Sequence, residues 1–210
     1  EVFKDPQINE LLQKLASRLA ANYRLHHTPS HPWFESKITY GNAVLPEALL
    51  LVSQIDGNRN FQQIAQKSFH YLCELQFQNE HFTVISNQTW YEPGIQTASS
   101  GEQPIDVAYT ILALSTFYEL TGNKRYLLQM KQAFDWYLGK NQLRQIVYNP
   151  ISGGCLDGIE ANEVNINQGA EATTTYLMAR NRIEHHLNQM RVQQLPNSFS
   201  QPNYPIVLVS

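Results

Sequence analysis

Three acidic residues occupy the same place in three similar segments of the chain. Glu47 lies in LPEAL, Asp106 in QPIDVA and Glu171 in QGAEAT, each where a predicted helix begins. Paired carboxyl groups cleave glycosidic bonds, one protonating the leaving oxygen and the other serving as base or nucleophile. An acid in a first helical turn is also favoured by ordinary capping and dipole effects. Both explanations stand for each acid.

The segment 152–179, SGGCLDGIEANEVNINQGAEATTTYLMA, adds a fourth acid and several amides. Asp157 precedes a glycine, a common turn pair. The amides either bind sugar hydroxyls or satisfy loop backbone groups; they are Asn165, Asn167 and Gln168. Aromatic side chains that could stack on sugar rings also fall in predicted loops, namely Trp33, Trp90 and Tyr91. The loops therefore hold the partners that a glycan site needs.

The elements that would position these groups are helices of two kinds. Amphipathic helices with one buried stripe are predicted after Asp5 and within 55–75 and 120–140, and the last two repeat one another. The first of these places Ile8, Leu11, Leu12, Leu15 and Leu19 on its buried side. Three other segments have apolar or small side chains on nearly every side of a helix: 45–55, 103–120 and 169–179. This pattern predicts helices covered on most sides.

This alternation predicts an all-α domain over residues 1–194, an α-hairpin array or partial (α/α) toroid. It has about three outer and three inner helices. The connections from inner to outer helix are short, whereas residues 24–44, 79–102 and 140–167 form long loops. The long loops should all leave on one face, where the inner helices begin. Residues 195–210 are expected to form an extended tail over the outside, and His185 and His186 to lie on a solvated helix surface.

The composition narrows the function classes. The 210 residues carry 18 acids and 15 bases without runs, a net charge of −3, which argues against nucleic-acid binding. No apolar run approaches the length of a membrane span, and we expect a soluble, cytoplasmic protein. The two cysteines, Cys73 and Cys155, lack metal-site spacing and are expected to be reduced structural thiols. We expect neither a metal nor a cofactor.

Three segments resemble a known family. HPWFESKITYGNAVLPEALL (31–50), GEQPIDVAYTILAL (101–114) and YNPISGGCLDGIEANEVNINQGAEATTTYLMA (148–179) are similar to the six-hairpin-glycosidase-like α/α-toroid domain found behind GT-B glycosyltransferases in bacteria. The last segment is the most specific. The resemblance implies a carbohydrate-related function. It carries over Trp33, Phe34, Glu35, Tyr40, Asn42, Pro46, Gln103, Pro104, Asp157, Gly158, Asn165, Asn167, Gln168, Gly169 and Glu171.

We therefore predict glycan hydrolysis or processing, with Glu171 and either Asp157 or Asp106 as acid and base. The predicted substrate-binding residues are Trp33, Glu35, Tyr40, Asn42, Glu47, Trp90, Tyr91, Gln103, Asn165, Asn167 and Gln168. The alternative is a non-catalytic carbohydrate-binding or scaffold module attached to a glycosyltransferase. A lyase or epimerase using His and Tyr is a third reading. Three hairpins make half of a six-hairpin ring, so a second copy or an upstream glycosyltransferase domain is the expected protein partner.

Overall fold

The computed structural model describes residues 5–78, 81–96, 98 and 100–194, and over these ranges the chain is mainly helical. The helices are α1 (Pro6–His26), α2 (Val44–Asp56), α3 (Arg59–Gln76), α4 (Pro104–Thr121), α5 (Arg125–Tyr137) and α6 (Ala170–Gln194). Two short antiparallel pairs interrupt the loops: β1 (Phe77–Gln78) with β2 (His81–Phe82), and β3 (Gly158–Ile159) with β4 (Val164–Asn165). The all-α prediction is confirmed. The predicted tail, 195–210, lies outside the described residues.

The helix boundaries follow from capping residues in the sequence. The Asp5 side chain accepts a hydrogen bond from the backbone N–H of Gln7 at 2.8 Å, and Pro6 begins α1. Both α2 and α4 end at a glycine in the left-handed region, Gly57 with φ 70° and Gly122 with φ 69°. These glycines make the short turns into α3 and α5, as predicted.

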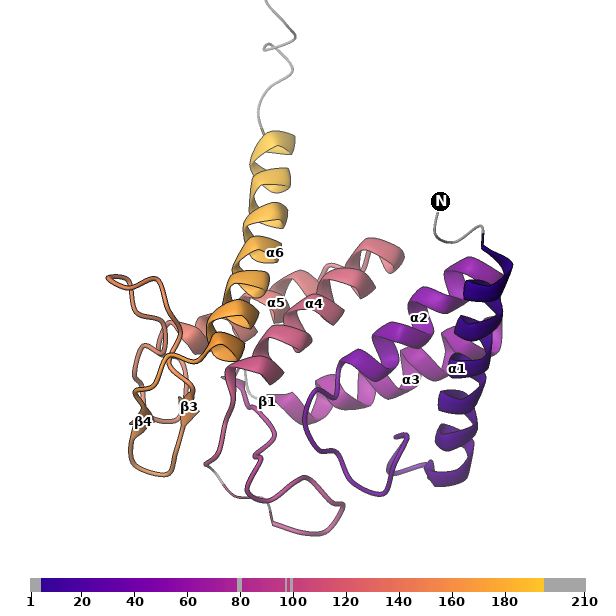
Figure 1. The fold of residues 1–210 in the computed structure, drawn as a ribbon, viewed down its shortest axis with the longest axis horizontal. Helices are drawn as coiled ribbons and strands as arrows, with labels where there is room; N and C mark the ends of the chain where they lie inside the picture. Colours follow the sequence, from indigo (N-terminus) through magenta and orange to yellow (C-terminus); the bar gives the residue numbers. More distant parts are fainter. Residues whose placement is uncertain (1–4, 79–80, 97, 99, 195–210) are drawn as a thin grey trace, which may run out of the picture.

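The inner helices α2, α4 and α6 all begin at the end of the molecule where the long loops gather (Figure 1). α3 packs on α2, whereas α5 and α6 both pack on α4. A smaller contact joins α2 to α4, and α1 covers α2. The long loops thus share one face, and the short turns lie away from it.

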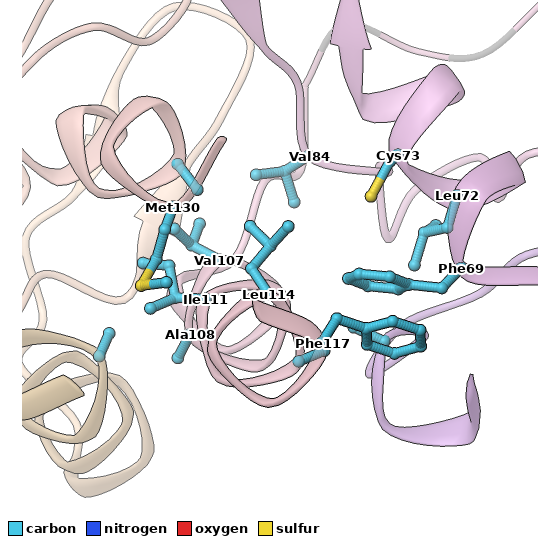
Figure 2. Packing of buried hydrophobic residues seen from close by; sticks show 14 of the residues in the cluster. Phe69, Leu72, Cys73, Val84, Val107, Ala108, Ile111, Leu114, Phe117 and Met130 are labelled. Atoms are coloured by element: carbon cyan, nitrogen blue, oxygen red, sulfur yellow. The ribbon is translucent and has the colours of Figure 1, made fainter. Parts of the chain in front are cut away.

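The core is centred on α4, which is buried along nearly its whole circumference. Phe117 of α4 stacks on Phe69 of α3 with ring centroids 4.0 Å apart, and Met130 of α5 packs from the opposite side (Figure 2). Ile111 and Leu114 of α4 are fully buried between these layers. The prediction that this helix is covered on most sides is correct.

Three expectations about helix faces are wrong in whole or in part. In α1, Ile8, Leu12 and Leu19 of the predicted stripe are partly buried, but Leu11 and Leu15 are 55% and 57% exposed, and the fully buried residues are Ala16, Ala20 and Tyr23. In α6, Leu177 is 50% exposed, because one broad side of that helix has no neighbour among the described residues. His186 is 3% exposed, because α6 continues past the predicted end of the inner helix and turns this ring onto α4.

No helix in the described ranges is long and apolar enough to cross a lipid bilayer. Cys73 and Cys155 are both buried free thiols, as expected. Burial raises the pKa of each to about 12, so both stay protonated at neutral pH.

Candidate functional site

The three long loops are tied to one another beside the beginnings of the inner helices. Ile38 and Tyr91 exchange backbone hydrogen bonds of 2.9 and 3.0 Å, which joins the first loop to the second. Glu102 and Ile159 pair in the same way and join the second to the third. Gly158 permits this contact, since a Cβ there would lie 2.7 Å from the Glu102 carbonyl oxygen. The loop face is therefore one connected surface.

Asp106, in the first turn of α4, is the most unusual acid on this face. Its side chain is buried, and Oδ1 accepts a hydrogen bond from the backbone N–H of Gly41 at 2.6 Å. Oδ2 is buried with no hydrogen-bond partner among the described residues. Burial raises the pKa of Asp106 to about 7; the Gly41 N–H opposes this rise, and the charge of Glu171 adds to it. Near neutral pH this carboxyl group holds a proton that it can donate.

Glu171 is the predicted acid whose charge acts on Asp106. It stands exposed in the first turn of α6, and its charge contributes to the raised pKa of the Asp106 carboxyl group. Two carboxyl groups in different environments, one buried with a raised pKa and one exposed, can take different roles in catalysis. Asp106 and Glu171 therefore form the candidate acid and base pair.

Asp157 and Glu47 are engaged in structural contacts. Asp157 Oδ1 accepts a hydrogen bond from the backbone N–H of Gly169 at 2.7 Å, just before α6 begins. The Glu47 carboxylate accepts one from the Thr116 hydroxyl at 2.6 Å, across the α2–α4 contact. Burial raises the pKa of Glu47, while the Thr116 hydrogen bond and the charge of Arg182 lower it. Each of these carboxyl groups therefore has one oxygen in a structural hydrogen bond.

The predicted aromatic platform needs correction. Trp33 is completely buried, packed edge-on against Phe34 in the core, and offers no face to a ligand. Trp90 is 46% exposed and Tyr40 58%, so these two rings are accessible. Tyr91 is partly buried, with its hydroxyl 3.4 Å from that of Tyr71. The loop aromatics therefore differ in exposure, because the residues packed around each ring decide whether it lies in the core or at the surface.

The polar residues predicted to bind substrate also differ in their exposure. The Asn42 side chain is buried, and both ends of its amide bond the Thr39 backbone at 3.0 Å, which fixes the loop before α2. This occupies the amide groups expected to bind substrate. Glu35, Asn167 and Gln168 are exposed, while Gln103 and Asn165 are half-buried. Gln168 also accepts a hydrogen bond from the Ser152 hydroxyl.

Glu102 was not among the predicted site residues. It is 6% exposed, and the Trp136 indole N–H donates to Oε2 at 2.5 Å. Burial raises its pKa to about 7, against the lowering effect of the Trp136 hydrogen bond. It lines a cavity of about 640 Å³ whose wall also includes His81 and Arg144. The only sequence signal was an acid just ahead of the proline that starts α4.

The two carboxyl groups whose pKa values are raised to about 7, Glu102 and Asp106, contact different parts of the molecule. Asp106 bonds Gly41, which precedes α2, whereas Glu102 bonds Trp136 on α5. The cavity at Glu102 has the size of an ordinary small-molecule site. No cluster of three or more metal-ligating side chains occurs in the parts of the chain that the structure describes. No protein-family model and no curated protein matches this chain.

Proposed function

We propose that this chain is a carbohydrate-active domain of the six-hairpin glycosidase-like type, in which Asp106 and Glu171 process a glycosidic bond. The observation that carries the proposal is the Asp106 carboxyl group, which is buried, raised in pKa to about 7 and left with one unpartnered oxygen beside Glu171. A buried polar atom without a partner is costly in a folded protein. A substrate oxygen that accepts the Asp106 proton would satisfy it.

In this proposal the two acids have separate roles. With a pKa of about 7, Asp106 is still protonated in a large share of the molecules near neutral pH, and it gives this proton to the leaving oxygen of the glycosidic bond. Glu171, exposed to solvent, activates a water molecule or attacks the sugar carbon itself. Sugar rings would stack on Tyr40 and Trp90, whose faces are accessible. The exposed amides of Asn167 and Gln168, where the third loop ends, would bind hydroxyl groups of the sugar.

The proposed architecture is a partial (α/α) toroid. In support, α2, α4 and α6 begin at one end of the molecule, and α1, α3 and α5 alternate with them along the chain (Figure 1). The exposed side of α6 is where a further hairpin or a partner would continue the ring. The proposed substrate is an oligosaccharide or glycoconjugate that reaches the loop face.

A second candidate function is a carbohydrate-binding module without catalysis. It is favoured by Asp157 and Glu47, whose carboxylates are held by a helix start and by Thr116. It is also supported by the cavity that Glu102 lines, whose wall includes neither Asp106 nor Glu171. In this case the loop face binds glycans, and Asp106 serves only to hold the Gly41 backbone.

A panel of oligosaccharides tests both functions, with the native chain, Asp106→Asn, Glu171→Gln and the matched control Glu163→Gln. Glu163 is an exposed acid of the same loop as Asp157. Hydrolysis by the native chain and the control, lost by at least a hundredfold in both site variants, supports catalysis. Binding without turnover in all four proteins points to the module. Turnover that survives in Asp106→Asn would rule out its role as the acid.

A further inference from the structure

The cavity of about 640 Å³ is lined by β2, by the residues that follow α5 and by the segment that leads into α4. None of the residues predicted to bind or cleave a glycan lines it. Phe82 and Val84 give its wall an apolar part. Four ionisable side chains also belong to the wall: His81, Glu102, Lys140 and Arg144. Because the cavity has the size of a small-molecule site, these side chains decide what it can hold.

Glu102 is the one acid among the described residues of the wall, and it has no counter-charge. Its Oε2 accepts the Trp136 indole N–H, and it forms no ion pair within the described ranges. Burial raises the pKa of Glu102 to about 7, and no neighbouring charge adds to this rise or opposes it. A cationic group of a ligand would therefore stabilise a carboxylate that the described part of the chain leaves unpaired.

Arg144 is the opposite case, a cation with no carboxylate bound to it in the described ranges. It is exposed, whereas Lys140 is held by Asp135 at 2.7 Å. Arg144 has a φ of 54°, the one positive φ among the described non-glycine residues. This backbone conformation is disfavoured for residues with a Cβ, and residues held in it gather at ligand sites. The segment after α5 thus presents an unpaired guanidinium group at the cavity.

We propose that this cavity binds a small zwitterion with an apolar body, its ammonium group beside Glu102 and its carboxylate beside Arg144. A guanidinium group can bind both oxygens of a carboxylate at once. The apolar body would lie against Phe82 and Val84. Free apolar amino acids and their dipeptides have this chemistry, whereas a neutral sugar would leave both charges unpaired. Such binding does not depend on glycan cleavage.

Isothermal titration calorimetry tests the two charges separately. The probes are L-leucine and leucyl-leucine, compared with 4-methylpentanoate and 3-methylbutylamine, which each lack one charge. The native chain should bind the better zwitterion about tenfold more tightly than either analogue. Glu102→Gln should remove the advantage over 4-methylpentanoate, and Arg144→Gly the advantage over 3-methylbutylamine. Glycine accepts the positive φ at position 144, so this variant removes the cation without straining the backbone.

The matched control is Arg59→Gln, which removes an exposed cation that does not line the cavity and should bind like the native chain. Failure of both zwitterions to bind would overturn the proposal, as would glucose binding as tightly as they do. A zwitterion advantage that survives both Glu102→Gln and Arg144→Gly would also overturn it, because another site would then hold the ligand.

Trp136 gives an independent readout in the unmodified chain. Its indole N–H bonds Glu102, so indole fluorescence follows the ionisation of this carboxyl group, with a midpoint near pH 7. An ammonium group beside the carboxylate favours its ionised form. A saturating amount of the zwitterion should therefore lower the midpoint by about one pH unit. An unchanged midpoint with bound zwitterion would refute the placement of the ammonium group.

Discussion

Replacing Asp106 by Asn should raise the free energy of unfolding, relative to that of the native chain, by more at pH 8 than at pH 5. The native pKa of Asp106 is about 7, against an ordinary value of 3.8. A raised pKa means that the folded state holds the proton more tightly than the unfolded state does. The stability that the proton contributes is complete below pH 4 and is lost as the pH rises through 7. Asn mimics the protonated form and can still accept the Gly41 N–H.

The magnitude follows from the two pKa values. Between pH 5 and pH 8, the native chain should lose about 2.5 kcal/mol of its free energy of unfolding through Asp106 alone. The Asp106→Asn variant should lack this loss. Urea denaturation of both proteins at the two pH values measures the difference between their pH dependences. Burial of the carboxyl group at 4% exposure justifies using the full pKa difference.

Asp135 provides the matched control. Burial opposes its ionisation, but hydrogen bonds and charges of Lys131 and Lys140 outweigh this and lower its pKa below 3.8. It is therefore ionised at both pH 5 and pH 8, and Asp135→Asn should change the stability equally at each. If Asp106→Asn behaves like this control, with the same effect at both pH values, the reasoning about the buried acid is refuted.

Three further predictions follow from local contacts. Indole fluorescence should titrate with a midpoint near pH 7 as Glu102 ionises beside Trp136, and Glu102→Gln should remove this transition; a flat native titration would contradict the raised pKa. Phe69→Ala should cost about 3 to 5 kcal/mol in urea denaturation, since it removes a buried ring stacked on α4; a cost below 1 kcal/mol would contradict that packing. Gly101→Ala should destabilise more than Gly122→Ala, because both have positive φ but only the first places a Cβ against a neighbouring side chain, at 2.4 Å; equal thermal midpoints would refute this.

The helices could be predicted from the sequence because each carries its own signals. Periodic apolar residues, Asp5 with Pro6 at one start, and glycines at two ends are local features that need no knowledge of the neighbours. Which face of a helix is buried depends on what packs there. In α1 the most buried positions are Ala16 and Ala20, whereas Leu11 and Leu15 remain exposed.

The site was less predictable for the same reason. The positions of Asp106 and Glu171 in first helical turns were evident in the sequence, but the burial of Asp106 depends on Gly41, far away in the chain. Trp33 looked like a loop aromatic and belongs to the core. Glu102 was not predicted as a site residue because its partner, Trp136, lies on α5, 34 positions away in the chain. Contacts between distant segments decide such roles, and no local pattern encodes them.

The separation of short turns from long loops has a consequence for how this molecule can change. Packing between helices resists substitution, since each core position touches several others. Loop tips do not share that constraint: Ile151 is 96% exposed and Ile166 78% exposed. Insertions and replacements at these tips should leave the helical frame intact. Descendants of this chain could therefore acquire new ligand preferences by remodelling one surface while inheriting the same folded frame.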